Sequence, residues 1–318
     1  MEREASAFLA ALRGRRSQRQ WARRLGYRGN PITDWERGAR FPTAQETLRA
    51  AALAGVDVEA SFRRFMPGLP ITREGAAFDL ASWLSALRGR SSLVEIGARS
   101  GLSRFSVARF LSGRARPRLP DFFRLVDAMT GRLPEWVAAF VPIELVPSLT
   151  GRFRAADAAR RIAFEVPWSE AVLRVLETQT YRKQRRHVRG SVAACLDMSE
   201  AEEAECLSRL TEAAIVECRA GRYSVRRGNT VDTQGGQQSL LNLKRHWATV
   251  AAARLEAPHE EDFFAYNVMS LSRADLDRAR EILRGAFREI RSLVAASHPE
   301  EVAALVNLQL VTFLPRTG

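Results

Sequence analysis

The chain has 318 residues, of which 46% are hydrophobic and 27% are charged, so wholesale disorder is excluded and about two to four domains are expected. No apolar run reaches the roughly 18 residues that a membrane span needs, and the N-terminus lacks the basic and apolar regions of a signal peptide. The 49 basic residues outnumber the 36 acidic ones, and the net charge of +13 favours a polyanionic partner. We therefore expect a cytoplasmic protein, whose three cysteines are reduced because their number is odd and no CxxC spacing occurs.

The positive charge is concentrated near the N-terminus. Residues 1–130 carry 23 arginines and 12 acidic residues, whereas the rest of the chain carries 26 basic and 24 acidic residues. The sequence therefore predicts a part that binds nucleic acid, followed by a nearly neutral part.

A repeat with a period of 75 residues lies in this basic part. The segment Phe8–Gly26 (FLAALRGRRSQRQWARRLG) returns as Trp83–Gly101 (WLSALRGRSSLVEIGARSG). The positions that match are mostly apolar or glycine, which are the positions that a fold constrains. We expect two copies of one helical domain, over residues 1–68 and 76–145.

Each copy has the pattern of a helix-turn-helix. In the first copy, Ser17 is a suitable N-cap for a second helix, and Gly26 is suited to the left-handed residue that ends it. Six residues later Ile32, with Trp35, forms the inner face of a third helix, which closes at Gly38. A small residue, a glycine at the turn and an apolar anchor are typical of this motif. The second copy repeats the plan with Gly97 or Ala98, Gly101, Val107, Phe110 and Gly113.

The first copy resembles the lambda-repressor-like (XRE) helix-turn-helix family, whose pattern runs SQ, A-x-x-LG, I-x-x-WE-x-G and P. The second copy is less similar, with Leu93 in place of the glutamine and Leu111 in place of the glutamate. The resemblance implies that the third helix of each copy enters the major groove of DNA. The matching residues are Arg13, Ser17, Gln18, Ala22, Leu25, Gly26, Ile32, Trp35, Glu36, Gly38 and Pro42.

The resemblance also implies which residues contact DNA. Arg104 or Arg109 would pair with guanine, Asn30 with adenine, and Gln18 with phosphate. The second copy carries six arginines and no acid between Ile96 and Pro120. The alternative for the arginines is a solvated face, and the alternative for Phe105 is an aromatic cap on the core. The predicted DNA-binding residues are Gln18, Arg28, Asn30, Thr33, Arg37, Arg40, Ser103, Arg104, Phe105, Arg109, Arg114 and Arg116.

A linker over residues 146–168 and a winged-helix-like domain over 169–230 are expected next. A helix from Ala171 runs to about Tyr181, and the basic run RKQRRHVR (182–189) after it either approaches DNA or lies on an exposed helix. Ser199 and Glu202 form a capping box for a helix with Ala204, Leu207, Leu210 and Ala214 on one face. Strands over 215–218 and 223–227, joined at Ala220-Gly221, follow. Seven acids within 190–220 favour packing or dimerisation over DNA contact here.

The last domain, over residues 238–318, is predicted to be α+β. One helix is expected over 240–255, and a long second helix begins after Ser272, which caps it together with Asp275. Strands are expected over 263–271 and 306–310. The segments MSLSRADLDRAREILRGAFREI and VNLQLVTFLP resemble the C-terminal region of a bacterial family with a winged-helix-like segment and no assigned activity. That resemblance covers about residues 168–315. An apolar stripe is expected on the long helix, at Leu276, Ala279, Leu283, Phe287, Ile290 and Val294.

No constellation in the sequence points to an enzyme, a cofactor or a metal. The four histidines are scattered, without HExxH spacing, and no GxxxxGK[ST] loop occurs. The sequence therefore predicts a mainly α, nucleoid-associated transcriptional regulator that binds double-stranded DNA and forms a homodimer through its C-terminal half. The role of that half is dimerisation or the sensing of an effector of unknown identity. The alternative is a protein-interaction adaptor whose helix-turn-helix copies are scaffolds.

Overall fold

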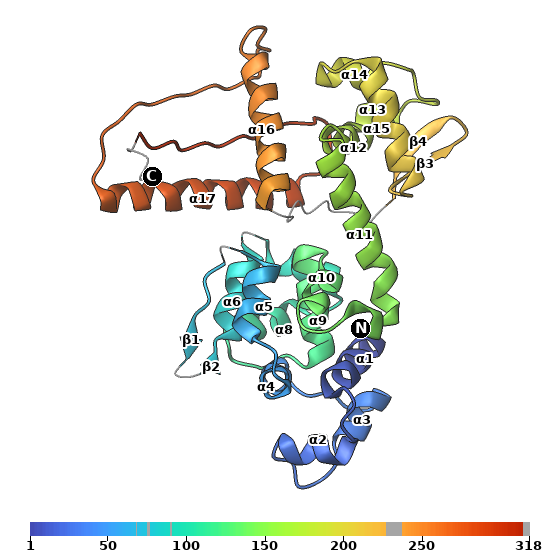
Figure 1. Ribbon diagram of the computed structural model, residues 1–318, viewed down its shortest axis with the longest axis vertical. Coiled ribbons are helices and arrows are strands. Elements are labelled where there is room, and N and C mark those ends of the chain that lie inside the picture. Colours follow the sequence, from blue (N-terminus) through green and yellow to red (C-terminus); the bar gives the residue numbers. More distant parts are fainter. Residues whose placement is uncertain (68, 75–76, 90, 227–236, 314–318) are drawn as a thin grey trace. The chain divides into compact units, whose positions relative to one another are not determined.

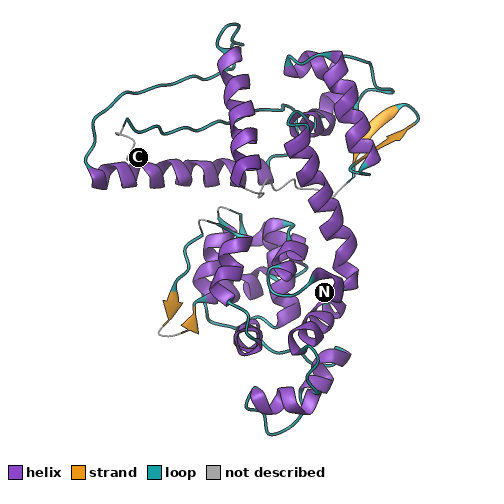
Figure 2. Ribbon diagram, viewed as in Figure 1, coloured by secondary structure: helices purple, strands orange, loops and turns teal. Residues whose placement is uncertain are grey.

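The computed structural model describes residues 1–67, 69–74, 77–89, 91–226 and 237–313 (Figure 1). The chain is mainly helical, as predicted, and two small antiparallel hairpins are its sheets in the described ranges (Figure 2). It divides into two compact units, Met1–Arg154 and Ala155–Gly318. No helix of the described ranges is long and apolar enough to cross a membrane.

The first unit contains five helices from each repeat, in the same order. A short hairpin, β1 (Arg73–Glu74) with β2 (Ala77–Phe78), lies between the two sets, and a 3-10 turn, η1 (Ile143–Leu145), follows the second. The first set is α1 (Glu2–Arg13), α2 (Gln18–Arg24), α3 (Ile32–Arg37), α4 (Ala44–Ala54) and α5 (Val58–Phe65). The second set is α6 (Leu80–Arg88), α7 (Leu93–Ser100), α8 (Arg104–Leu111), α9 (Leu119–Thr130) and α10 (Leu133–Ala138).

Local capping sets the ends of the helices in both repeats. The Ser17 hydroxyl accepts the N–H of Gln20, whose side chain in turn accepts the N–H of Ser17, so a capping box begins α2. Ser92 begins α7 in the same way. Gly26 and Gly101 follow α2 and α7 with φ of +83° and +71°, a conformation that favours glycine. The predicted N-cap and left-handed turn are confirmed.

The two repeats share one aromatic core. Phe8 of α1 and Trp136 of α10 have ring centroids 5.5 Å apart, and Phe62 of α5 lies 4.6 Å from Trp83 of α6. All four side chains are at most 1% exposed. Residues 1–68 and 76–145, which the sequence suggested as separate domains, therefore bury their apolar faces against each other within a single unit.

Gly97 provides the close approach of α7 to the turn that precedes α8. It is buried, whereas Ala98 is exposed, so Gly97 is the small inward residue of this repeat. A Cβ at position 97 would lie 2.9 Å from the backbone oxygen of Leu102. Real Cβ atoms do not approach a carbonyl oxygen that closely, so a larger residue would push α7 away from the turn.

We expect Gly97→Ala to lower the free energy of unfolding by about 1–3 kcal/mol, because the added methyl forces a backbone shift in a packed region. Thermal and urea unfolding of the full chain would measure the loss. Gly29→Ala is the matched control, because nothing lies within 4 Å of its added Cβ. Equal stability of the two variants would contradict the close approach.

The segment 146–168, where we expected a linker, is largely helical. Helix α11 (Pro147–Glu165) begins with a proline, which the first helical position tolerates, and then contains no strong helix breaker except Gly151. Leu149 belongs to the core of the first unit and Ile162 to that of the second. The helix therefore contributes side chains to both cores.

After the end of α11, the second unit continues with four helices and a hairpin. The capping box of Ser199 and Glu202 is confirmed. The hairpin is also confirmed, with Val216 opposite Val225 and with Ala220 and Gly221 at φ of +51° and +76° in a two-residue turn. Position 227, the expected end of its second strand, lies outside the described residues. The elements are α12 (Ser169–Glu177), α13 (Gln179–Arg182), α14 (Ser191–Leu196), α15 (Glu200–Glu212), β3 (Val216–Arg219) and β4 (Arg222–Val225).

Two expectations for this region are wrong in part. Ala204 is exposed, and the buried face of α15 consists of Glu203, Cys206, Leu207 and Leu210, so that the buried position is taken by a glutamate with internal partners. Ala214 is also exposed, because the helix ends at Glu212 and Ala214 follows it with φ of +55°. The basic run 182–189 leaves α13 as an irregular loop and is not an exposed helix.

The three cysteines are free thiols, and burial raises the pKa of Cys206 to about 12.

The remainder of the second unit consists of two helices and extended segments. Ser272 caps the long helix α17 (Arg273–Ala296), as predicted, and α16 (Gln237–Arg254) covers the other expected helix. The strands expected over 263–271 and 306–310 are wrong, since no strand occurs within residues 237–313. A strand needs a hydrogen-bonded neighbour, and these segments have none in the single chain. They leave large apolar side chains exposed, among them Phe263, Tyr266, Val268, Val306 and Leu308.

Candidate nucleic-acid interface

Helix α8 has one buried side and one basic, exposed side. The Ser103 hydroxyl accepts the N–H of Ser106 at 3.1 Å and so begins the helix. Val107 is buried in the core, whereas Arg104 and Arg109 are exposed. The predicted residues Ser103, Arg104, Phe105 and Arg109 therefore share the solvent side of the first two turns.

Phe105 is part of this exposed surface. Its side chain is 68% exposed, so it does not cap the core. The guanidinium carbon of Arg104 lies 4.8 Å from the centre of the Phe105 ring. A cation over an aromatic face is held by the ring quadrupole, so the two side chains present a combined flat, positively charged surface.

The exposed positive charge of α8 continues into the segment behind it. Arg114 and Arg116 are exposed there. Within the described residues, the structure records no ion pair for Arg104, Arg109, Arg114 or Arg116. Such uncompensated guanidinium groups attract phosphate and suit bidentate contacts with guanine.

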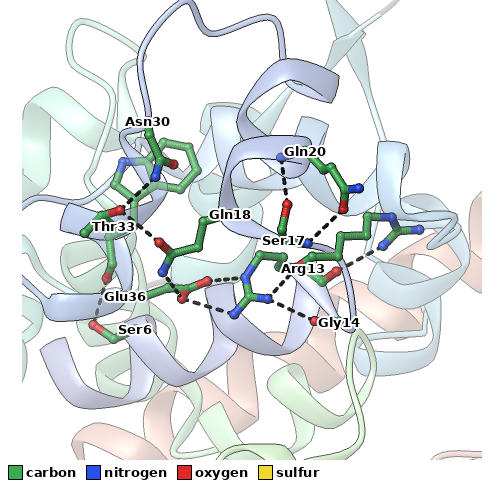
Figure 3. Close-up of polar contacts among 11 residues, drawn as sticks. Ser6, Arg13, Gly14, Ser17, Gln18, Gln20, Asn30, Thr33 and Glu36 are labelled. Carbon is green, nitrogen blue, oxygen red and sulfur yellow. Dashed lines mark hydrogen bonds and ion pairs between the residues drawn. The ribbon is translucent and has the colours of Figure 1, made fainter.

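Three of the predicted residues of the first repeat, Gln18, Asn30 and Thr33, lie in a series of hydrogen bonds that connects α2 with α3 (Figure 3). The Asn30 amide donates to Thr33 Oγ1 at 2.9 Å, and Thr33 Oγ1 donates to Gln18 Oε1 at 2.9 Å. The Gln18 amide nitrogen then donates to Glu36 Oε2 at 2.7 Å. Asn30, Thr33 and Gln18 are thus brought together, and one N–H of Gln18 remains for a phosphate.

Glu36, the last member of this series of hydrogen bonds, forms a bidentate ion pair with Arg13 of α1. Arg13 Nε and Nη2 donate to the two carboxylate oxygens at 2.6 and 3.1 Å. The two side chains are only 21% and 14% exposed, so solvent screens the pair weakly. The network fixes α2 and α3 to α1 and holds Gln18 and Thr33 in place.

The second repeat has apolar groups where the first has this network. Leu93 and Leu111 replace Gln18 and Glu36, and Ala108 replaces Thr33. Leu111 is 8% exposed and packs in the core. The α7–α8 pair is therefore held by apolar burial, which leaves its polar and charged side chains on the surface.

Helix α3 presents fewer residues than α8 because of Pro31. The residue before a proline avoids the helical conformation, so Asn30 stays outside the helix and α3 starts at Ile32. Arg28, Arg37 and Arg40 are exposed around this short helix, and none has an ion pair in the described ranges. These positions suit phosphate contacts more than contacts with base edges.

Sequence reasoning missed a buried polar cluster in the second unit. Glu203 of α15 is 2% exposed and accepts the N–H groups of Gly190, at 3.0 Å, and of Ala193, so it caps α14. His187 Nε2 lies 3.1 Å from Glu203, and its Nδ1 lies 3.2 Å from the hydroxyl of Tyr181. Burial raises the pKa of Tyr181 to about 12. No local signal distinguishes Glu203 from its exposed acidic neighbours, since its partners come from a distant loop.

Comparison with known proteins gives one family. Residues 162–313 match a family described as a domain of unknown function (DUF4423). No curated protein and no solved structure matches the chain. The matched residues begin within α11 and end after α17, so they lie in the second unit.

Proposed function

We propose that this protein is a sequence-specific transcriptional regulator that binds double-stranded DNA through its first unit. In this proposal α2–α3 and α7–α8 are helix-turn-helix units of the lambda-repressor-like type, with α3 and α8 in the major groove. The observation that carries the proposal is the exposed set on α8, Arg104, Phe105 and Arg109, whose charges have no ion-pair partner in the described residues. The protein would act in the cytoplasm, at the nucleoid, without catalysis.

The second unit would join two chains or sense a signal. Its α12–α15 helices and β3–β4 hairpin suit a winged-helix-like plan, but the outer side of α15 carries exposed carboxylates that repel phosphate. The stripe of α17 leaves Phe287 and Val294 exposed at 45% and 65%, which favours burial against a second chain. The protein would therefore be a homodimer that presents four helix-turn-helix units.

A protein-interaction adaptor is the second candidate. The exposed aromatic residues Phe263, Tyr266 and Phe313 favour it, because their side chains are 88–95% exposed and suit a protein partner. An adaptor would use the first unit as a scaffold, so its affinity for duplex DNA would be weak and nearly independent of the salt concentration.

The separation of the two units gives the test. We expect residues 1–154 to bind random duplex DNA with a logarithm of affinity that falls linearly with the logarithm of salt concentration, by about 0.9 for each phosphate contact. Residues 155–318 should bind weakly. A fragment that ends at 130 is unsuitable, because it lacks the buried Trp136 of the shared core. Equal affinity of residues 155–318 and the whole chain would overturn the proposal, and so would the absence of salt dependence.

A further inference from the structure

The segments that follow α3 and α8 pair with each other. The N–H of Ala44 donates to the carbonyl of Pro117 at 2.9 Å, and the N–H of Leu119 donates to the carbonyl of Pro42 at 3.0 Å. Between these two bonds, Thr43 and Arg118 form an antiparallel bridge. The paired segments, 42–44 and 117–119, are repeat equivalents, separated by the same 75 residues as the repeat.

This pairing is reciprocal. Adding 75 to Ala44 and subtracting 75 from Pro117 turns the first hydrogen bond into the second, and the central pair exchanges its members. A contact in which one residue meets the equivalent of its partner, in both directions, is the signature of a two-fold axis. A translation from one repeat to the next would bring two different surfaces together instead.

The shared core follows the same symmetry. Phe8 of α1 lies 6.2 Å from Phe140, behind α10, and Trp83 of α6 lies 6.3 Å from Phe65 at the end of α5. Phe8 and Trp83 are repeat equivalents, and so are Phe65 and Phe140. The two ring pairs therefore join the first repeat to the second in matching ways, on opposite sides of the axis.

Each repeat also keeps the same internal turns. Gly14 and Gly89 end α1 and α6 with φ of +61° and +56°, and Gly38 and Gly113 follow α3 and α8 with φ of +76° and +72°. Because these turns match, α3 has the same position within the first repeat as α8 has within the second. A two-fold axis between the repeats then relates α3 to α8.

We infer that residues 1–154 are an internal pseudo-dimer, which binds one duplex at two half-sites in inverted order with a single chain. The inference rests on the proposed function. The symmetry of a DNA-binding protein is mirrored by its site, and half-sites of a two-fold dimer lie about one helical turn apart. The half-sites must differ in sequence, because Asn30 corresponds to Phe105 and Asp34 to Arg109. A carboxylate accepts from cytosine, whereas a guanidinium donates to guanine.

The experiment uses the full chain and duplexes selected from a random library. Three duplexes are then compared at one salt concentration: both selected half-sites in inverted order, the same half-sites in direct order at the same spacing, and one half-site alone. We expect the direct arrangement to bind at least about ten-fold more weakly than the inverted one, and about as weakly as the single half-site. Arg109→Ala should relax the preference in one half-site, and Asn30→Ala in the other.

The outcomes separate the two proposals. Salt-dependent DNA binding with equal or better affinity for the direct arrangement would overturn the pseudo-dimer and leave DNA binding intact. Selection of a single half-site would also overturn it. If no duplex is selected and binding to random DNA is insensitive to salt, the proposed function fails, and the inference fails with it.

Discussion

Replacing Arg104 by alanine is expected to weaken binding to the specific site by about 1–3 kcal/mol and to relax the preference at one base position. The guanidinium lies on the first turn of α8, exposed and over the ring of Phe105, and has no ion pair in the described ranges, so its loss leaves no internal partner unsatisfied. The change should therefore appear in DNA binding and not in the melting temperature. Titration against the selected site and a scrambled duplex at equal salt would measure both affinity and discrimination.

Arg28→Ala is the matched control in the first repeat. Arg28 is also exposed, but it lies in the turn before α3 and not on the helix. We expect a smaller loss, similar for the specific and the scrambled duplex, together with a salt slope that is lower by about 0.9. If Arg28→Ala abolished discrimination and Arg104→Ala preserved it, the assignment of Arg28 to a phosphate and of Arg104 to a base edge would be wrong.

A second large effect is expected from charges on the apolar stripe of α17. Phe287→Glu combined with Val294→Glu would place two carboxylates in the proposed dimer contact, where each unpaired buried charge costs about 3–5 kcal/mol. The dissociation constant of the dimer should rise by more than about 100-fold. Sedimentation equilibrium at micromolar concentration would show the change. Both side chains are exposed in the single chain, so its own fold should tolerate the substitutions.

The control for this prediction is another apolar residue of the same helix. Ile282 is 63% exposed and lies about a third of a turn away from the stripe, as the 3.6-residue period requires. Ile282→Glu changes charge and apolarity as each stripe substitution does, and it should leave the dimer intact. A chain that is monomeric at micromolar concentration, with and without DNA, would refute the dimer itself.

The features that were predicted correctly from the sequence are local. The capping box at Ser17, the left-handed glycine at 26 and the turn at Ala220-Gly221 depend on neighbours within a few residues, and such patterns leave a clear signal. The alternation of apolar and polar residues over 306–310 indicated a strand for the same local reason. A strand also needs a neighbour to pair with, and the pattern does not say whether the same chain supplies it.

The features that the sequence did not predict depend on distant residues. Glu203 is buried because Gly190 and Ala193 donate to it and His187 lies beside it, and nothing in the spacing of the acidic residues marks it. The pairing of Thr43 with Arg118 is equally non-local. For the candidate interface, the repeat placed Thr33 on α3 and Arg104 and Arg109 on α8, as the structure does, but Asn30 lies before α3 because of Pro31. The hydrogen-bonded chain from Asn30 to Arg13 appeared only when the side chains were placed.

The shared aromatic core has a consequence for folding. Phe8 packs against Trp136, which follows it by more than a hundred residues, so the core closes only after nearly all of the first unit has been synthesised. A repeat on its own would expose its share of the aromatic core to water, and this exposed apolar surface would make the isolated repeat unstable. The unit should therefore fold as one cooperative, two-state element, at a rate limited by non-local contacts. During synthesis, the aromatic residues of the first repeat would stay exposed until the second repeat is complete. We therefore expect a chaperone to bind the chain at this stage.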